Sequence, residues 1–332
     1  GITGMNKGIL NVIYQSDDNY AVVSAISIVS LLENNKHLKE INIFYLGHQL
    51  KKASINKFNK MVGNYQNATI TFVDVSSYPD ELKEIGVKAW KGLYITWYKM
   101  LAFAKLDIKT DRILYINPHT VISGALDGLL ELDFEDNVLA LSYDATMVNA
   151  HKDVIGLKPT DGYFNCGIML INHKKWMKDK IDAKMREHLR HNHYEVADQD
   201  LCNVFFKGKI KKVGVEYNFS TVFYGYDIKK YIKANGFLPE SFYSYDEIME
   251  SYYTPKIIHS QFGMNGRPWQ QGNENPVGIL WRKYLNLTPW KNTTMPAAKK
   301  DMNWRLYDLL PQSIIVKLYA WAVNRKFARK KS

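Results

Sequence analysis

The sequence predicts an α/β fold in which helices cover both faces of a mostly parallel sheet. Two observations carry this prediction. Short apolar runs rich in β-branched and aromatic residues alternate with segments whose apolar residues recur at helical spacing, and such alternation favours parallel pairing. The 332 residues are 46% hydrophobic, enough to bury one large core or a main domain with an appendage.

The first half of the chain alternates regularly. The expected strands are residues 9–14, 41–46, 69–73 and 112–116, and the expected helices are 19–32, 51–62 and 94–106. The run 113–122 reads as a buried strand, a break at Asn117-Pro118-His119, and a second short strand. Polar groups at the carboxyl end of a strand lie where open α/β sheets bind ligands, so this break indicates a ligand-binding edge.

The second half is less regular. We expect strands at 138–142, 163–171 and 256–259, helices at 174–190 and 197–206, and an aromatic-rich region of loops and short elements at 217–253. We interpret residues 1–4 as a cloning scar, 5–288 as the main domain, and 289–332 as a linker and a C-terminal helix. The chain has neither a G-x-G-x-x-G segment nor a P-loop, which argues against a dinucleotide dehydrogenase or a P-loop kinase.

The composition indicates the compartment in which we expect the protein and bears on whether it spans a membrane. The two cysteines, Cys166 and Cys202, form neither a disulfide framework nor a zinc motif, which fits a reducing compartment. No run approaches the roughly 18 apolar residues that a membrane span requires. We therefore expect a cytoplasmic protein.

The first strand–helix junction carries the polar segment Gln15-Ser16-Asp17-Asp18-Asn19-Tyr20. Helix capping accounts for one such residue. Two aspartates followed by an amide and a tyrosine exceed what a cap needs. Carboxylate and amide groups can read the edge of a uracil ring, and Tyr20 can stack on it. We expect this segment to hold a nucleotide base.

Two further segments place amides and acids beside apolar elements. Asn165 and Gly167 interrupt an apolar strand, as a bulge in the core or as a pocket where the glycine admits a ligand close to the backbone. Asp198 and Gln199 lead a helix, where capping explains Asp198 but leaves Gln199 without a structural reason.

The last motif follows the strand at 256–259. His259 precedes a loop with Gly263, Gly266 and Arg267. A lone histidine after a strand is more often structural. Here arginine and backbone N–H groups would supply donors to a diphosphate, and His259 would ligate a metal or bind a phosphate oxygen.

Taken in order, these motifs resemble those of glycosyltransferase family 8, the retaining hexosyltransferases of the GT-A fold. The segments that carry the resemblance are D-D-N-Y, the aromatic helix around Tyr98-Lys99, F-N-C-G-I-M-L-I-N, D-Q-D-L-C-N and I-I-H followed by R-P-W, and they cover roughly residues 9–270. The resemblance implies a Rossmann-like mixed sheet flanked by helices, here with a C-terminal helical appendage. It also implies transfer of galactose or glucose from a UDP-sugar to a glycan acceptor on a lipid carrier or a glycoprotein.

The resemblance implies roles by position. Residues Ser16 to Tyr20 would bind uridine. Asn165, Asp198 and Gln199 would be the catalytic group that holds the hexose, with Gln199 facing the anomeric carbon. The diphosphate would be bound by a larger set, comprising Lys99, Asn117, His119, His259, Gly263, Gly266 and Arg267. Asp144, after the strand at 138–142, is the candidate for the acceptor side.

The sequence departs from the family pattern at two positions. The family's helix arginine is Lys99 here, which keeps the charge but loses bidentate geometry. The D-x-D motif, whose carboxylates hold Mn²⁺ with a histidine, reads Asn117-Pro118-His119. Losing two carboxylates should weaken Mn²⁺ or Mg²⁺ strongly, because hard cations prefer them.

Three alternatives remain open from the sequence. The enzyme is metal-independent, with positive charge from His119, Lys99 and Arg267. Alternatively, Asn117, His119 and His259 keep an altered metal site that favours borderline metals. In the third alternative the protein is a non-catalytic UDP-sugar binder or partner-stabilising protein. We favour an active transferase, because the base, sugar and phosphate motifs all persist.

The C-terminal segment predicts a basic amphipathic helix after Pro311. Its apolar stripe would comprise Ile314, Ile315, Leu318, Trp321 and Ala322, widened by Tyr319, Val323 and Phe327. Six of the net +11 charges lie there without an acid, at Lys317, Arg325, Lys326, Arg329, Lys330 and Lys331. Such a helix is typical of peripheral attachment to a membrane, here the inner membrane surface; the alternative is a helix docked on the main domain. No nucleic-acid-binding motif accompanies it.

Overall fold

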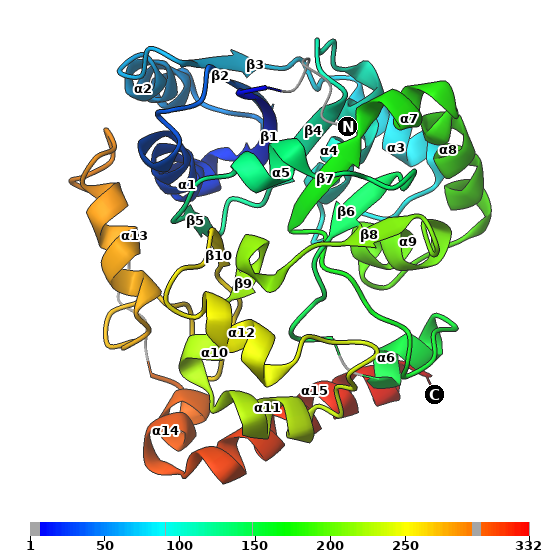
Figure 1. Ribbon diagram of the computed structural model, residues 1–332, viewed down its shortest axis with the longest axis vertical. Helices are drawn as coiled ribbons and strands as arrows, with labels where there is room; N and C mark the ends of the chain where they lie inside the picture. The colour runs from blue at the N-terminus through cyan, green and yellow to red at the C-terminus, as the bar shows by residue number, and fades with distance from the viewer. Residues whose placement is uncertain (1–6, 90, 148, 294–299, 332) are drawn as a thin grey trace.

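A computed structural model of the chain describes residues 7–89, 91–147, 149–293 and 300–331. The segment interpreted as a cloning scar lies outside the described residues. A seven-stranded sheet in the order β3-β2-β1-β4-β7-β6-β8 forms the centre (Figure 1). Its strands are β1 (Ile9–Asp17), β2 (Glu40–His48), β3 (Ala68–Phe72), β4 (Arg112–Ile116), β6 (Leu139–Leu141), β7 (Ile168–Asn172) and β8 (Ile210–Lys212).

The sheet is mixed. Strands β3, β2, β1 and β4 are parallel, β7 runs antiparallel to β4 and to β6, and β8 is parallel to β6. A smaller sheet joins β5 (Thr120–Ile122), β10 (Ile257–His259) and β9 (Phe219–Ser220). The predicted α/β class with a Rossmann-like mixed sheet is therefore confirmed.

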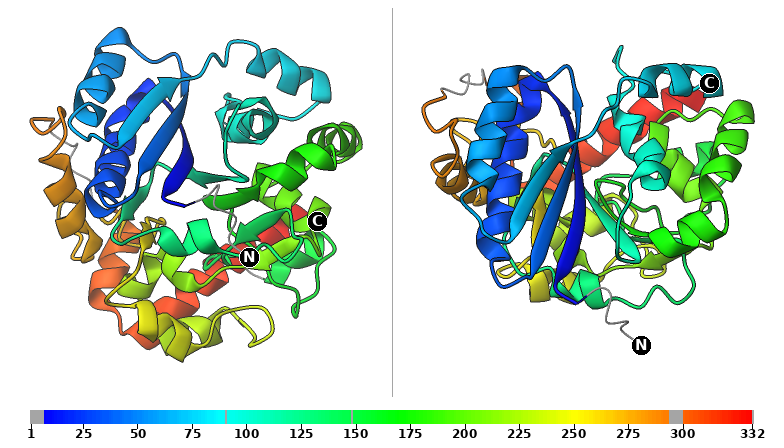
Figure 2. Two further views of the ribbon diagram at one scale, coloured as in Figure 1. Left: turned by 45° about the horizontal axis from the view of Figure 1, so that its top comes forward. Right: turned by 90° about the horizontal axis from the view of Figure 1, so that it is seen from above.

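Helices cover both faces of the large sheet, as the view from above in Figure 2 shows. Helices α1 (Ala21–Asn34) and α2 (Lys52–Val62) lie on one face. The other face is covered by α3 (Tyr78–Ile85), α4 (Tyr98–Lys105), α7 (His173–Lys178), α8 (Ile181–His191) and α9 (Ala197–Phe205).

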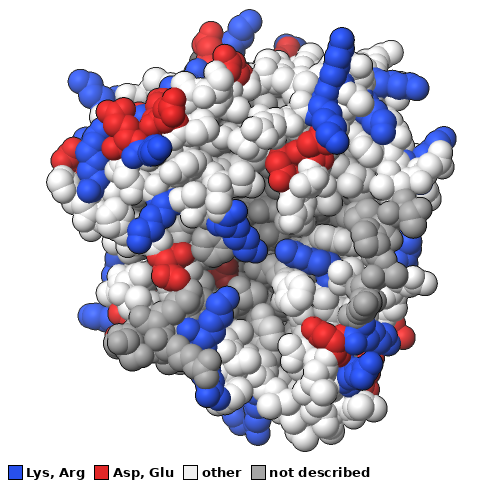
Figure 3. Space-filling model, turned by 180° about the vertical axis from the view of Figure 1, so that it is seen from behind, with Lys and Arg blue, Asp and Glu red and all other residues white. Residues whose placement is uncertain are grey.

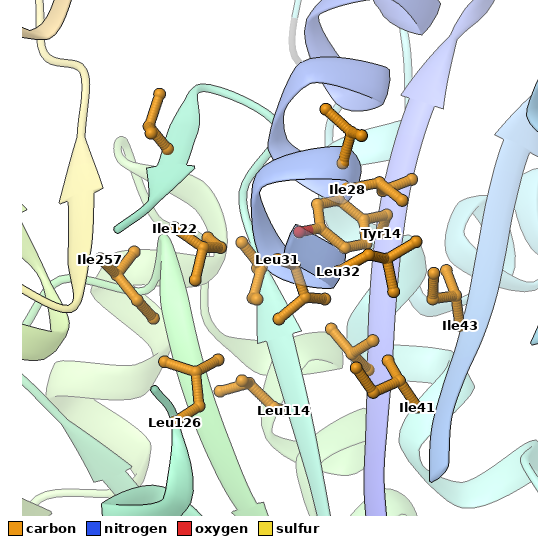
Figure 4. Close-up of a cluster of buried hydrophobic side chains, with 14 of the residues drawn as sticks. Tyr14, Ile28, Leu31, Leu32, Ile41, Ile43, Leu114, Ile122, Leu126 and Ile257 are labelled. Carbon is orange, nitrogen blue, oxygen red and sulfur yellow. The ribbon is translucent and has the colours of Figure 1, made fainter. Parts of the chain in front are cut away.

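Strand alternation explains the two layers. Along β1, Val12 and Tyr14 join the core under α1, whereas Ile13 joins the core on the opposite face. Strand β4 divides in the same way, with Leu114 on one side and Tyr115 on the other. Figure 4 shows Tyr14 and Leu114 converging with side chains of α1, β2 and β5.

The remaining elements are 3₁₀ turns and helices, most of which lie on the side of the molecule that carries the small sheet (Figure 1). They are the 3₁₀ turns η2 (Asp18–Tyr20), η3 (Ile95–Trp97) and η4 (Val215–Tyr217), and the helices α5 (Asp127–Glu131), α6 (Asn149–Val154), α10 (Val222–Gly225), α11 (Ile228–Ala234), α12 (Tyr245–Ser251), α13 (Val277–Leu285), α14 (Met302–Leu309) and α15 (Gln312–Lys331). The turns η2 and η3 instead begin helices beside the large sheet.

Three segments differ from the sequence prediction. The helix expected at 174–190 is two helices, because Lys180 takes a left-handed conformation (φ 53°) between them. The strand expected from residue 163 begins at Ile168, and Phe164 makes only an isolated bridge with Tyr143. The aromatic region 217–253 forms three short helices around its own core, where rings such as Phe237 and Phe242 stack.

The C-terminal helix docks on the main body along one face. Ile315, Val316 and Ala320 of α15 are buried against α11 and α6. Ile314, Leu318 and Trp321, which the sequence placed on the same stripe as Ile315, remain exposed on a second face. The single predicted stripe was therefore wrong, because neighbouring helices divide it between a docked face and a free one.

The linker predicted after residue 288 is partly anchored. Trp290 is buried in the core under α1 and α2, with its ring 5.0 Å from that of Phe58. The division of the chain at residue 288 stays a prediction. Among the described residues, no helix has the length and apolar character needed to cross a membrane.

Candidate functional site

A cavity of about 460 Å³ opens at the carboxyl ends of β1 and β4. These adjacent strands belong to different halves of the large sheet, because β2 lies beside β1 and β7 lies beside β4. Such a position is where open α/β sheets bind nucleotides. The cavity is lined by Gln15, Ser16, Asp17, Tyr20, Lys91, Leu93, Ile95, Thr96, Lys99, Tyr115, Asn117, Pro118, His119, Asn165, Cys166, Gly167, Val196, Ala197, Asp198, Gln199, His259 and Arg267.

The junction after β1 supplies only part of the expected uridine site. Ser16, Asp17 and Tyr20 line the cavity. Asp18 instead turns away: its Oδ1 accepts hydrogen bonds from Lys51 N (3.0 Å) and Ser54 Oγ (2.7 Å) at the start of α2. Asn19 is exposed and lies outside the lining.

Lys99 and Asp198 form a buried ion pair on one wall. The distance from Lys99 Nζ to Asp198 Oδ2 is 2.7 Å. Thr96 adds a hydrogen bond from Oγ1 to Asp198 Oδ1 (3.1 Å), and its carbonyl accepts from Lys99 Nζ (2.8 Å). The charge of Lys99, which the metal-free alternative assigned to the diphosphate, is thus directed at Asp198.

Asn165 and Gln199 share one support, Asp144. Asp144 Oδ2 accepts from Asn165 Nδ2 (2.7 Å) and from Gln199 Nε2 (3.1 Å). Its Oδ1 accepts from the backbone of Thr146 and Met147. Asp144 is buried and is not among the residues that line the cavity. Its carboxylate lies behind the two amides.

Gly167 is required by packing. A Cβ at this position would lie 2.3 Å from Cε1 of His259, closer than any real contact. The missing side chain at Gly167 therefore makes room for the His259 imidazole. The sequence had suggested that the glycine admits a ligand.

The break after β4 forms a compact turn. Asn117 Oδ1 accepts from His119 N (2.9 Å), and the His119 ring stacks on Trp269 with centroids 5.6 Å apart and planes at 4°. Tyr20 meets the same imidazole edge-on at 5.2 Å. Burial, followed by the positive charge of Arg267, lowers the pKa of His119 to about 3. Burial lowers the pKa of His259 to about 4.

Two further cations line the cavity, the exposed Lys91 and the half-buried Arg267. Arg267 Nη1 donates to Ser260 O (3.1 Å), and Arg267 forms no ion pair with any described carboxylate. Gly263 and Gly266 do not offer N–H groups to a diphosphate as expected. Their N–H groups bond each other's carbonyls (3.4 and 3.1 Å), closing the turn that precedes Arg267.

The donor set does not fit Mn²⁺ or Mg²⁺. Asn117, His119 and His259 offer one amide and two imidazoles, whereas these hard cations take oxygen ligands and favour carboxylates. In the described part of the chain, no three histidine, cysteine or acidic side chains are grouped to hold a metal.

A second cavity of about 310 Å³ adjoins the first. The two share Asn117, His119, His259 and Arg267, and the second extends to Phe262 and to Tyr319 of α15. On the face seen in Figure 3, basic side chains are interspersed with acidic ones, and several basic ones border a central hollow.

Sequence reasoning missed three contributors. Gln15 accepts a hydrogen bond from Lys99 N (2.9 Å), and Thr96 holds Asp198. Asn218 bonds both Asn165 and His259. Gln15 begins the polar segment after the first strand but was given no role there, and Thr96 and Asn218 lie in segments without a recognisable pattern.

Comparisons with known proteins agree with this geometry. The model of the family described as "Glycosyl transferase family 8" matches residues 11–271. The chain is 25% identical over 300 residues to a lipopolysaccharide 1,2-glucosyltransferase of Escherichia coli, covering 87% of this chain and 82% of the relative. It is 22% identical to a lipopolysaccharide 1,3-galactosyltransferase of Salmonella typhimurium (86% and 80%).

Solved structures show the same fold. The galactosyltransferase LgtC, determined with donor and acceptor sugar analogs, superposes with a TM-score of 0.60 at 19% identity, covering 90% of this chain and all of that one. The bifunctional glycosyltransferase WbbM gives 0.68 at 20% identity over 86% of this chain and 50% of that one. With the family model spanning both the sheet and the cavity, this chain belongs to glycosyltransferase family 8.

Proposed function

We propose that this glycosyltransferase moves a hexose, galactose or glucose, from a UDP-sugar to a glycan acceptor with retention of configuration. The observation that supports this most is the single cavity into which Ser16 and Asp17, Asp198 and Gln199, and Arg267 all project. Three motifs far apart in sequence thus offer groups for a base, a sugar and a diphosphate along one continuous surface.

In this proposal different residues of the cavity lining bind different parts of the UDP-sugar. Ser16, Asp17 and Tyr20 bind uridine, Asp198 and Asn165 hold the hexose, and Arg267 binds the diphosphate. Gln199 faces the anomeric carbon. Asp144 acts as a support for Asn165 and Gln199, since its carboxylate already accepts five hydrogen bonds, rather than as a direct contact to the acceptor.

The reaction exchanges two bonds on one face of the sugar. The bond from the anomeric carbon to the diphosphate oxygen breaks as UDP leaves, and a bond to the acceptor oxygen forms from the same side. The acceptor's proton passes to the departing diphosphate. Arg267 stabilises the charge that develops there, because a guanidinium in a buried site interacts strongly with a phosphate.

We further propose that this transfer does not require Mn²⁺. The imidazoles of His119 and His259 are neutral near pH 7 and Lys99 is paired with Asp198, so Arg267 and the exposed Lys91 are left to compensate the diphosphate charge. This narrows the metal-free alternative, in which Lys99 and His119 were also counted as sources of positive charge.

The acceptor is proposed to be a glycan on a lipid carrier or a glycoprotein, approached from the inner membrane surface. Two named relatives act on lipopolysaccharide. The free face of α15 displays Ile314, Leu318 and Trp321, and the adjoining Lys317 and Arg325 are also exposed. Apolar and basic side chains on one helix favour peripheral attachment to an anionic membrane in the cytoplasm.

The test measures UDP release from UDP-galactose and UDP-glucose with a lipid-linked glycan acceptor, in EDTA and in Mn²⁺. We expect release that EDTA leaves unchanged. Measurable UDP binding with no release under any condition would instead establish the second candidate, a non-catalytic UDP-sugar binder. Release that appears only with Mn²⁺ would overturn metal independence while leaving the transferase proposal intact.

A further inference from the structure

A chain of buried hydrogen bonds leads from Asp144 to His259 behind the cavity. Its first amide, Asn165, has only one orientation that satisfies its neighbours. Its Nδ2 donates to Asp144 Oδ2 (2.7 Å), and its Oδ1 accepts from the backbone N–H of Gly167 (2.7 Å). A carboxylate oxygen accepts and a backbone N–H donates, so the Asn165 amide cannot be turned over without losing both bonds.

This orientation fixes the next amide. Asn218 Nδ2 lies 2.9 Å from Asn165 Oδ1, which is an acceptor, so Asn218 must donate there. Its Oδ1 then points at Nδ1 of His259, 3.0 Å away. An amide oxygen can only accept, which requires a proton on Nδ1 of the imidazole.

We propose that Asn218 is a positioning residue that holds His259 with its proton on Nδ1 and its lone pair on Nε2, presented to the donor cavity. The histidine borders both cavities, and its Nε2 makes no hydrogen bond to any residue that the structure describes. A Cβ at Gly167 would collide with Cε1 of the same ring, so packing also restricts the rotation of the imidazole.

The tautomer decides what His259 can bind. A nitrogen with a lone pair binds an electron-pair acceptor, which is a ligand hydroxyl hydrogen or a divalent cation. It does not donate to a diphosphate oxygen, which was one of the two roles expected from the sequence. The diphosphate is therefore bound by Arg267 and not by His259. Instead, His259 accepts a hydrogen bond from a hydroxyl of the bound nucleotide sugar or ligates a cation of the borderline class.

The tautomer can be measured directly. In protein labelled with ¹⁵N-histidine, long-range ¹H–¹⁵N spectra near neutral pH separate protonated from unprotonated ring nitrogens, and the signals lost in His259→Gln assign this residue. We expect a protonated Nδ1 and an unprotonated Nε2 in the wild type. A wild-type His259 protonated on Nε2 would overturn the proposal, whether or not any variant folds.

Two variants test the role of Asn218. Asn218→Leu keeps the volume but removes the acceptor, and we expect His259 to become a mixture of tautomers. Asn218→Asp keeps an acceptor for Nδ1–H while losing the donation to Asn165 Oδ1, and we expect it to keep the proton on Nδ1. The matched control is Asn35→Leu, which removes a buried amide that bonds Leu31 O and Leu126 N outside both cavities. An unchanged tautomer in folded Asn218→Leu would contradict the assignment.

Titrations then identify the ligand of Nε2. A shift of the Nε2 signal on adding UDP-glucose in EDTA indicates a hydroxyl, and a shift that requires Zn²⁺ together with UDP indicates a cation. No shift in either titration would show that Nε2 does not face the ligand. We expect Asn218→Leu to weaken nucleotide-sugar binding about tenfold, the lower end of the effect of removing a residue that orients a metal-ligating histidine. The expected loss of nucleotide-sugar binding rests on the proposed function, but the tautomer of His259 does not. A failed binding prediction can therefore be told apart from a failed tautomer assignment.

Discussion

Lys99 of α4 and Asp198 of α9 form an ion pair of 2.7 Å in the wall of the donor cavity. Burial alone would lower the pKa of Lys99, but the Asp198 carboxylate raises it above its ordinary value. The pair keeps Lys99 in its charged form and ties α4 to α9, the helix that carries Gln199.

Replacing Lys99 by Met should be strongly destabilising. The change leaves the Asp198 carboxylate buried without a partner, which costs about 3–5 kcal/mol in comparable cases. Urea unfolding measures this cost. The control is Lys105→Met on the same helix, which breaks the more exposed pair with Glu81 and should cost about 0–1 kcal/mol. Equal losses in both variants would contradict a special role for the Lys99–Asp198 pair.

The free energy of unfolding should fall in mild acid. The pKa values of His119 and His259 in the folded protein are about 3 and 4, below the value of about 6.5 for an unfolded chain. Between pH 6.5 and 4 the unfolded state therefore binds more protons, and stability decreases as the pH decreases, by up to about 1.4 kcal/mol per pH unit for each histidine.

Urea unfolding at several pH values from 7 to 4 tests this dependence. Both His119→Gln and His259→Gln should flatten the profile, whereas His193→Gln, at an exposed position, should not. A profile that keeps its slope in the first two variants would assign the acid sensitivity to other groups.

Restoring aspartates at the break after β4 should create affinity for Mn²⁺. The double variant Asn117→Asp/His119→Asp adds two carboxylates beside His259, a ligand set that hard cations favour. Calorimetric titration of Mn²⁺ in the presence of UDP should show binding in the double variant and none in the wild type. The two single variants serve as controls and should be intermediate. Wild-type protein that binds Mn²⁺ as tightly as the double variant would contradict the conclusion that the wild-type residues do not fit this ion.

Removing the ring of Tyr20 should weaken binding of UDP. This side chain lines the cavity, is 46% exposed and meets His119 with the two ring planes nearly perpendicular, so exposed ring surface remains to stack on uracil. Loss of one base–aromatic stack costs about 1–3 kcal/mol. In calorimetric titrations Tyr20→Phe should bind UDP like the wild type and Tyr20→Ala more weakly. Tyr253→Ala, at an exposed ring away from the cavity lining, is the matched control; if Tyr20→Ala binds as tightly as this control, stacking is excluded.

The free face of α15 should bind anionic vesicles. Leu318→Ser/Trp321→Ser removes exposed apolar side chains without touching the docked Ile315 and Val316, so we expect loss of vesicle binding with little change in stability. Sedimentation with vesicles of phosphatidylglycerol measures this. Ile279→Ser, which removes an exposed apolar side chain from α13, should bind normally. Vesicle binding retained by the double variant would argue that α15 serves only as a docking helix.

Several elements could be predicted from the sequence because they depend on local patterns. The apolar runs of β1 and β4 and the helical spacing of α1 predicted the layered sheet. Polar residues at strand ends predicted the edge that carries the cavity, where Asn165, Asp198, Gln199, His259 and Arg267 indeed meet. The resemblance carried by these motifs predicted the family.

Other features depend on contacts between distant segments. Asp18 follows Asp17 directly, yet the start of α2 removes it from the cavity by supplying two donors. Lys99 pairs with Asp198, and not with a diphosphate, because α4 and α9 bring the two side chains together in the wall of the cavity. The apolar stripe of α15 is split because α11 and α6 cover only one side of it.

By itself, the sequence determined the fold class, the family and the absence of the D-x-D carboxylates at Asn117 and His119, since strand composition, motif order and residue type are local properties. Only the tertiary structure decided how the charges and protons are distributed. It paired Lys99 with Asp198, left Arg267 and the exposed Lys91 as the cations of the described cavity lining without an ion pair, and linked Asp144 to His259 through Asn165 and Asn218. Hydrogen-bond direction and burial depend on which groups the fold brings together, and no pattern along the chain records them.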